Sequence, residues 1–201
     1  MKRSVFSKLH IRFNAPVTLG FALLCCAAFL LQKIIPSSQL KVFSVYRCSL
    51  SDPLAFVRLF GHVLGHAGVE HLVGNMMYIL LLGPILEEKY GKGNIIIATA
   101  VTAVITGIAC MLFNDAHTAS LGASGVVFAF IVLTSFTAVK EKEIPLTTVL
   151  VILLYLGEQI FLAITKGGNV GYGVHILGGL IGAVIGYVLN AGRKGSTSRG
   201  Y

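Results

Sequence analysis

Residues 122–133 read GASGVVFAFIVL, which places Ser124 at the head of an apolar run. Further along the chain, residues 171–182 read GYGVHILGGLIG, a second apolar run with one histidine, His175. Polar and ionisable side chains are costly inside membrane helices, and where they occur there they usually mark a functional site. The two runs therefore predict a helical chain in which a hydroxyl and an imidazole meet in an apolar environment.

The composition indicates a membrane protein. Of the 201 residues, 55% are hydrophobic and 12% are charged, whereas a soluble domain carries about 25% charged residues. The net charge of +8 does not indicate nucleic-acid binding, because the basic residues lie between apolar runs and at the termini rather than on one face. The cysteines lie mostly within apolar runs, so we expect no disulfide framework.

Six apolar segments are long enough, or nearly so, to cross a bilayer, which takes about 20 residues. This pattern predicts one all-α, polytopic membrane domain over residues 1–201. We expect the first segment to be a span rather than a signal peptide, because no small-residue cleavage pattern follows it. The predicted spans are 16–35, 72–86, 94–113, 125–139, 145–164 and 172–190.

Residues 36–65 form the longest connection between predicted spans. This segment is too apolar for a free linker and too interrupted by proline and serine for a span. Irregular backbone at membrane depth must be buried in protein or line a water-filled cavity. We therefore expect a structured outer loop that is partly embedded in the membrane.

Lysine and arginine are distributed unevenly between the two sides that six spans define. Because cytoplasmic loops carry the excess of these residues, we expect both termini, including a tail at 192–201, to be cytoplasmic. Six helical spans with short loops favour a bacterial inner membrane. The expected cytoplasmic set is Lys2, Arg3, Lys8, Arg12, Lys89, Lys92, Lys140, Lys142, Arg193, Lys194 and Arg199, and the outer set is Lys41, Arg47, Arg58 and Lys166.

Ser124 and His175 are expected at the same depth. At 1.5 Å per residue, Ser124 lies about 24 Å above Lys140, and His175 lies about 27 Å above Arg193. The hydrocarbon core is about 30 Å thick, so the fourth helix is expected to be short and to begin inside the membrane.

The second span carries further polar residues, which are expected near the depth of Ser124 and His175. His71 and Asn75 are four apart and share a helix face, at heights of about 24 and 18 Å above Glu87, and His66 lies just before the helix. Polar residues of this kind also join membrane helices without any catalytic role. Several of them at matching depth favour a common site near the outer side.

A serine hydroxyl is a weak nucleophile that needs a base within hydrogen-bonding reach, and Ser124 and His175 fit these roles. No carboxylate is placed to orient the imidazole, so we expect a catalytic dyad. Gly122 and Gly125 permit a tight start to the fourth helix, whose free amide N–H groups point at an incoming oxyanion. Phe128, one turn after the serine, is expected to pack against the His175 ring.

The sixth span has a face of small residues. Gly178 and Gly182 are four apart, and Gly179 and Gly186 extend the same pattern. Small residues allow membrane helices to approach closely. We expect this face to bring the helix of His175 against the helix of Ser124.

Three motifs in this order resemble the rhomboid intramembrane serine proteases in their minimal, six-helix bacterial form. They read HAGVEHLVGN at 66–75, GASG at 122–125 and HILG at 175–178. Arg58 matches the arginine of a Trp-Arg loop motif in that family. Glu87 followed by Gly91, together with Gly182, adds to the resemblance, which covers most of the chain.

The resemblance implies a six-helix rhomboid bundle and a role for each matching residue. Ser124 would be the nucleophile, His175 the general base, His66 and Asn75 oxyanion donors, and His71 a supporting residue. It also implies substrates that are single-span transmembrane proteins in the lipid bilayer, an acyl-enzyme intermediate, and no cofactor. The span 145–164 and the outer loop after it would act as the mobile gate.

The chain departs from the family pattern at three places. It has no tryptophan, so the loop motif reads Val57-Arg58; Val174 replaces the usual alanine, and Phe128 stands where tyrosine is common. Both the serine and the histidine are present, which favours an active protease. A rhomboid-like pseudoenzyme that binds transmembrane clients, and a small membrane transporter, remain alternatives.

Other polar residues are given structural interpretations. His62 is expected to be solvated in the outer loop, with a place at the entrance of the site as the alternative, and His117 is expected to lie on the surface. Glu158 and Gln159 are expected near the outer interface rather than along a hydrated path. His62, His66 and His71 do not match a His-Glu-x-x-His pattern, so we expect no metal site.

Overall fold

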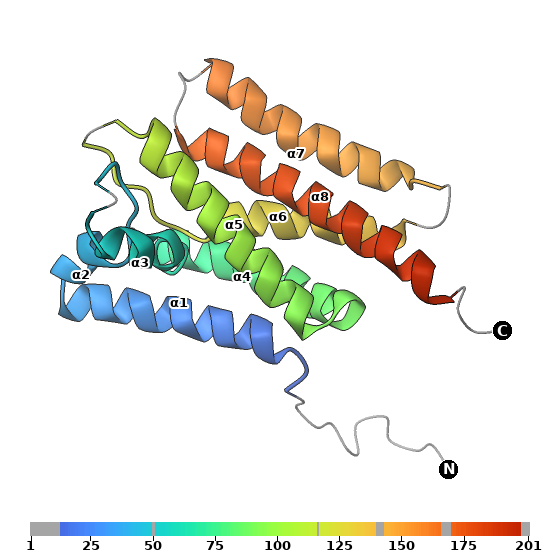
Figure 1. Ribbon diagram of the computed structural model, residues 1–201, viewed down its shortest axis with the longest axis horizontal. Coiled ribbons are helices and arrows are strands. Elements are labelled where there is room, and N and C mark those ends of the chain that lie inside the picture. Colours follow the sequence, from blue (N-terminus) through green and yellow to red (C-terminus); the bar gives the residue numbers. More distant parts are fainter. Residues whose placement is uncertain (1–12, 50, 116, 140–142, 166–169, 198–201) are drawn as a thin grey trace, which may run out of the picture.

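The computed structural model describes residues 13–49, 51–115, 117–139, 143–165 and 170–197. The named secondary-structure elements of this part of the chain are all helices, and an isolated β-bridge joins Val45 to Ser120, which confirms the all-α prediction. Five helices are long and apolar enough to cross a membrane. They are α1 (Pro16–Ile34), α4 (Val69–Tyr90), α5 (Lys92–Phe113), α7 (Leu146–Thr165) and α8 (Val170–Thr197), and Figure 1 shows them as one bundle.

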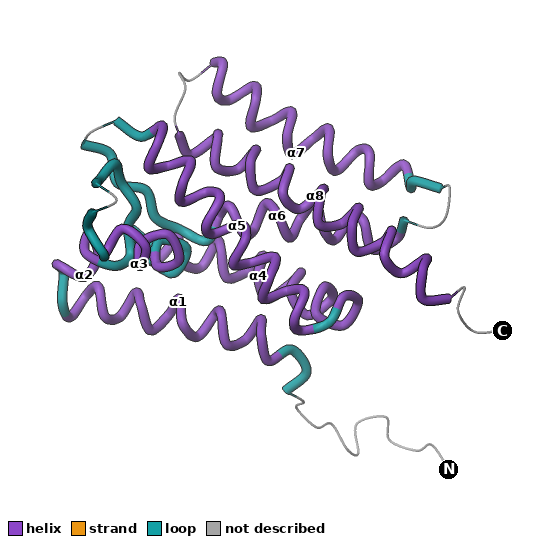
Figure 2. The backbone as a smooth tube through the Cα atoms, in the orientation of Figure 1, coloured by secondary structure: helices purple, strands orange, loops and turns teal. Residues whose placement is uncertain are grey.

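The remaining helices are short. The segment 36–65 contains α2 (Ser37–Lys41) and α3 (Leu54–Gly61), and α6 (Ser124–Ser135) is followed by a 3-10 turn, η1 (Phe136–Ala138). Figure 2 shows how loops connect α2 and α3 beside the long helices.

Each predicted span corresponds to a helix, with differences at the ends. The second span begins earlier than predicted, at Val69, and continues to Tyr90, where Gly91 with a φ of 87° ends the helix. α8 remains helical to Thr197, within the segment predicted as a tail. Most of the predicted outer loop 165–171 lies outside the described residues. The same holds for the basic residues Lys2, Arg3, Lys8, Arg12, Lys140, Lys142, Lys166 and Arg199.

α6 lies in the centre of the bundle (Figure 1). Its 12 residues reach about 18 Å at 1.5 Å per residue, which is less than the roughly 30 Å of the hydrocarbon core. Most of its side chains are buried, on all sides of the helix, as expected for a helix that is apolar all round. Its most extensive helix contact is with α8.

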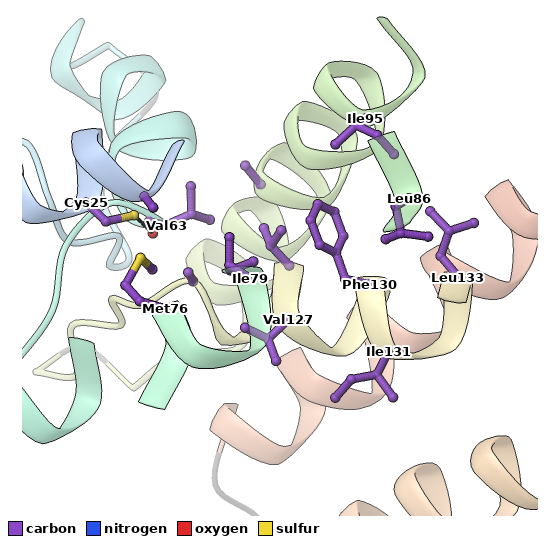
Figure 3. Packing of buried hydrophobic residues seen from close by; sticks show 14 of the residues in the cluster. Cys25, Val63, Met76, Ile79, Leu86, Ile95, Val127, Phe130, Ile131 and Leu133 are labelled. Atoms are coloured by element: carbon purple, nitrogen blue, oxygen red, sulfur yellow. Dashed lines mark hydrogen bonds between the residues drawn. The ribbon is translucent and has the colours of Figure 1, made fainter. Parts of the chain in front are cut away.

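The apolar core extends from α6 to its neighbours, as Figure 3 shows. Phe130 and Val127 of α6 belong to one buried cluster with Ile79 and Leu86 of α4 and Ile95 of α5. This packing fixes α6, and therefore Ser124 at its start, relative to α4.

A buried glutamate joins α1 to α4. The Glu87 carboxylate accepts hydrogen bonds from the backbone N–H of Val17 and Thr18, at 3.2 and 3.0 Å, and from the Thr18 hydroxyl at 3.0 Å. The first N–H groups of a helix have no partner within the helix, and their positive end attracts a carboxylate. Glu87 therefore caps α1 from a neighbouring helix.

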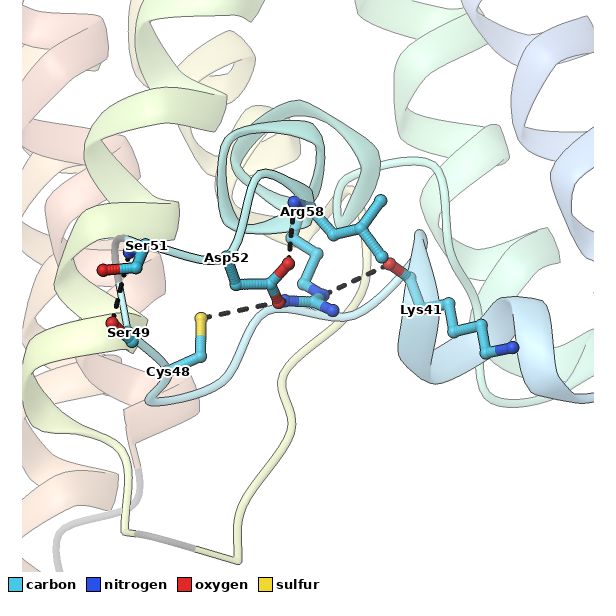
Figure 4. A network of polar contacts seen from close by, with 7 residues as sticks. Lys41, Cys48, Ser49, Ser51, Asp52 and Arg58 are labelled. Atoms are coloured by element: carbon cyan, nitrogen blue, oxygen red, sulfur yellow. Dashed lines mark hydrogen bonds and ion pairs between the residues drawn. The ribbon is translucent and has the colours of Figure 1, made fainter.

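The segment 36–65 is organised around Arg58, which is buried (Figure 4). Its guanidinium donates to Asp52 Oδ2 at 2.7 Å and to the Lys41 carbonyl at 3.2 Å, and it stacks over the Tyr46 ring at 4.6 Å. The hydrogen bond from Arg58 lowers the pKa of Asp52 below its usual value. The arginine thus joins both ends of the segment into a structured loop.

Candidate active site

α6 and α8 approach so closely that backbone meets backbone. A Cβ atom on Gly178 would overlap the Gly125 carbonyl oxygen, and one on Gly182 would overlap the Ala129 carbonyl oxygen. Gly125 itself lies against the side chains of Thr106 and Val174, each 3.2 Å from the position of its absent Cβ. Two glycines one turn apart on α8 therefore set the separation of these helices.

This approach brings the helix segments of Ser124 and His175 together. Ser124 directly precedes Gly125, and His175 lies one turn before Gly178. The Phe128 ring, one turn after Ser124, is stacked on the His175 ring, with 4.4 Å between centroids and 8° between planes. Among the described residues no hydrogen bond joins Ser124 Oγ to His175. Such contacts are often loose before substrate binds.

The turn that leads into α6 requires glycine at position 122. Gly122 has a φ of 132°, and a Cβ there would lie 2.7 Å from the His71 ring. Its backbone N–H donates to the His62 carbonyl at 2.8 Å. The backbone before Ser124 is therefore held between α4 and the residue that follows α3.

His66 and Asn75 form a buried hydrogen-bonded pair. Asn75 Nδ2 lies 3.0 Å from His66 Nε2, and His66 Nδ1 lies 3.1 Å from the Leu64 carbonyl oxygen. Burial lowers the pKa of His66 to about 4, so the ring is neutral near pH 7. Because an amide nitrogen only donates, Nδ1 of this neutral ring donates to Leu64 and Nε2 accepts from Asn75. His71 lies edge-on to His66, 5.1 Å away between centroids.

The interpretation of His62 as a solvated loop residue is wrong. It is 3% exposed, with Nδ1 3.1 Å from the Arg58 carbonyl oxygen and Nε2 3.4 Å from Thr106 Oγ1 of α5. The reason is that α3 packs against α5 at Gly107, next to the His62 ring. Burial lowers the pKa of His62 to about 4, so this histidine is a neutral interior residue.

The structure also assigns a partner to Gln159 that the sequence did not suggest. Gln159 is 5% exposed, and its Oε1 lies 2.8 Å from His175 Nδ1. It therefore faces the interior of the bundle. The only signal in the sequence was an amide within an apolar helix, and such residues usually face the bundle interior. The group that contacts Nδ1 of the His175 imidazole is thus the side-chain amide of Gln159 and not a carboxylate.

An apolar groove of about 330 Å³ lies between α5 and α8, beside the turn of His175. Its lining offers almost no polar surface, so it fits an apolar chain rather than water. The lining residues are Ala109, Phe113, Gly173, Val174, Ile176, Leu177 and Leu180.

The fold and these residues define a polytopic α-helical membrane protein with a serine and a histidine on two closely packed helices. The rhomboid domain family model matches residues 53–192, and the chain belongs to the rhomboid family. It is 28% identical over 120 residues to the rhomboid protease GlpG from each of two strains of Klebsiella pneumoniae. These matches cover 59% of this chain and 43% of each relative, so the match spans less than half the length of those proteins.

Proposed function

We propose that this protein is an intramembrane serine endopeptidase that cleaves transmembrane segments of single-span membrane proteins. The close approach of α6 and α8 at Gly125 and Gly178 carries this proposal. It supports a nucleophile at Ser124 and a base at His175, because both residues lie within one turn of the glycine contact. Membership of the rhomboid family is consistent with this chemistry.

Peptide hydrolysis would proceed in two steps. Ser124 Oγ attacks the carbonyl carbon of the scissile bond while His175 Nε2 takes its proton, and the histidine then gives this proton to the departing amine. The acyl group is left as an ester on Ser124. A water molecule, deprotonated by His175, attacks the ester, and the proton returns to Ser124 as the acid is released.

The developing oxyanion needs donors that are already in position. The first N–H groups of α6 are unpaired within the helix, and Asn75 keeps a second amide hydrogen after donating to His66. We therefore assign Asn75 and the start of α6 as the donors. His66, whose Nε2 accepts from Asn75, holds that amide in place, in contrast to the donor role that the resemblance implies for it.

The proposed setting is a bacterial inner membrane, with both termini cytoplasmic, six crossings including the short α6, and the site open to the outer side. Substrates would approach laterally, with small and helix-weakening residues near the cleaved bond. α7 is the span with the smallest buried share, 11% of its most apolar window. It is therefore the helix that moves at least cost, in agreement with the gate that the family resemblance implies.

The test is cleavage of tagged single-span membrane proteins by the purified protein in detergent or liposomes, with sequencing of the new termini. The wild-type protein should produce defined cuts inside or beside the spans. Ser124→Ala and His175→Ala should each abolish them while the variants still unfold cooperatively as folded proteins. Undiminished cleavage by Ser124→Ala would refute the proposal, and client binding without any cut would indicate a pseudoenzyme.

A further inference from the structure

α7 differs from the other spans in how it is attached to the bundle. Its only buried side chains among the described residues are two polar ones, Thr148 near its start and Gln159 in its second half. The Thr148 hydroxyl donates to the Ser135 carbonyl at 2.7 Å, and Gln159 contacts His175. The two polar contacts thus lie more than two turns apart on α7, and one of them is made to the proposed base.

The contact with Gln159 specifies which nitrogen of His175 carries the hydrogen. Oε1 of an amide only accepts, so at 2.8 Å from His175 Nδ1 it requires a hydrogen on that atom. A neutral imidazole has one hydrogen, and Nε2 therefore keeps a free lone pair. This is the form in which the ring can take a proton from a serine hydroxyl.

The ring of His175 is held by two contacts of different kinds. Stacking on Phe128 fixes the plane of the ring. A stacked ring can still flip by half a turn, which exchanges its two edges and leaves the plane unchanged. The hydrogen bond to Gln159 removes this freedom, because only one edge of the ring presents Nδ1. In serine hydrolases with a triad, a carboxylate performs both of these tasks, orientation and choice of tautomer.

We propose that Gln159 is a positioning residue of the active site: it holds His175 with Nδ1 protonated and Nε2 directed away from α7 as the base. This inference rests on the proposed function. It also means that the base is correctly set only while α7 is docked, since Gln159 belongs to that helix.

Several titratable groups lie near Gln159 and His175, and they must be the same in all the variants that are compared. His71 of α4 is a titratable neighbour that interacts with His175. Tyr155 of α7 lies edge-on to Phe128 at 6.1 Å and interacts with Tyr78 of α4 and Glu158 of α7. Variants at position 159 leave all four in place, so a change in pH dependence between them reports on position 159.

The experiment measures the rate at which a fluorophosphonate modifies Ser124 of the full chain, as a function of pH. Gln159→Met keeps the size of the side chain and removes the acceptor. Its rate should fall by at least about tenfold, and by less than the 10²–10⁴-fold that positioned acid–base groups contribute in full. Gln159→Glu should recover the rate at alkaline pH, with the acid limb moved up by about one pH unit or more, because an adjacent carboxylate favours the charged imidazolium.

Thr148→Val is the matched control, since it removes the other polar contact of α7 and preserves shape. The acid limb of its pH–rate profile for labelling should coincide with that of the wild type. Nitrogen-15 spectra of labelled histidine, assigned with His175→Ala, should show His175 protonated at Nδ1 in the wild type and a shift toward the other tautomer in Gln159→Met.

The outcomes separate this inference from the function on which it rests. If the wild type is neither labelled nor able to cut any substrate, the proposed function fails and the inference with it. If the wild type is labelled, the inference alone is overturned by a wild-type rate in Gln159→Met, by an unmoved acid limb in Gln159→Glu, or by a wild-type ring protonated at Nε2.

Discussion

A methyl group added at Gly178 tests whether the contact between α6 and α8 sets the geometry of the site. The new Cβ would overlap the Gly125 carbonyl oxygen and lie 3.0 and 3.1 Å from the carbonyl carbon and Cα of the same residue. All three atoms are backbone, so no side chain can rotate out of the way. The two helices must separate, and Ser124 and His175 separate with them.

The expected loss of stability comes from overpacking, which costs about 1–3 kcal/mol and occasionally more. Alanine is also a better helix former than glycine, by about 1 kcal/mol. A control variant with the same substitution on the same helix carries the same gain, which then cancels in the comparison. Gly173→Ala provides it, because a Cβ there meets no atom of the described residues within 4 Å.

Thermal unfolding in one detergent compares the two variants. Gly178→Ala should be about 1–3 kcal/mol less stable than Gly173→Ala, and a difference of 1 kcal/mol moves the midpoint by roughly 2–4 °C in globular proteins of similar size. Cleavage should fall much further, since a displacement of 1 Å can cost about 10²-fold in rate. Equal midpoints and equal rates for the two variants would refute the reasoning.

Three other predictions concern separate parts of the molecule. Glu87→Gln should lower the free energy of unfolding by about 1–3 kcal/mol, because one amide oxygen cannot replace a carboxylate on three donors; thermal unfolding measures it. Asn75→Ala should reduce kcat by about 10²–10³-fold, as expected for loss of one oxyanion donor. The contribution of His62 and His66 to the free energy of unfolding should be present above pH 6.5 and lost between pH 6.5 and about 4, because both stay neutral in the folded protein in this range while the unfolded chain binds protons.

Each of these predictions can fail in a distinct way. An unfolding midpoint unchanged by Glu87→Gln would show that the cap of α1 contributes little. A kcat unchanged by Asn75→Ala would remove that residue from the oxyanion site. Stability that is constant from pH 7 to pH 4 would mean that the two histidines are protonated as easily in the folded protein as in the unfolded chain.

The sequence predicted the helices well because their apolar runs are long and their boundaries are marked by glycine, proline and charge. Gly91 ends α4 and Pro16 begins α1, as such residues commonly do. Glycine spacing on the sixth span likewise indicated a close contact, which the structure contains between Gly178 and Gly125. These features are local, and a single segment carries the whole signal.

What could not be predicted depends on contacts between distant segments. α7 is apolar on nearly every side, so no periodicity shows which face is inside, and the partner of Gln159 lies on the next helix. His62 has the same difficulty, because its burial arises from α3 packing on α5 rather than from its neighbours in the chain. The hydrogen bonds of Glu87 with α1 span 69 and 70 residues, which is why its capping role was not predicted.

The central claim is that Ser124 is a nucleophile activated by His175. It is tested most directly by reacting the folded protein with a fluorophosphonate and locating the adduct by mass spectrometry of the digested chain. We predict one adduct, on Ser124, that disappears in His175→Ala although that variant remains folded. An unmodified Ser124, or equal modification with and without His175, would contradict the claim.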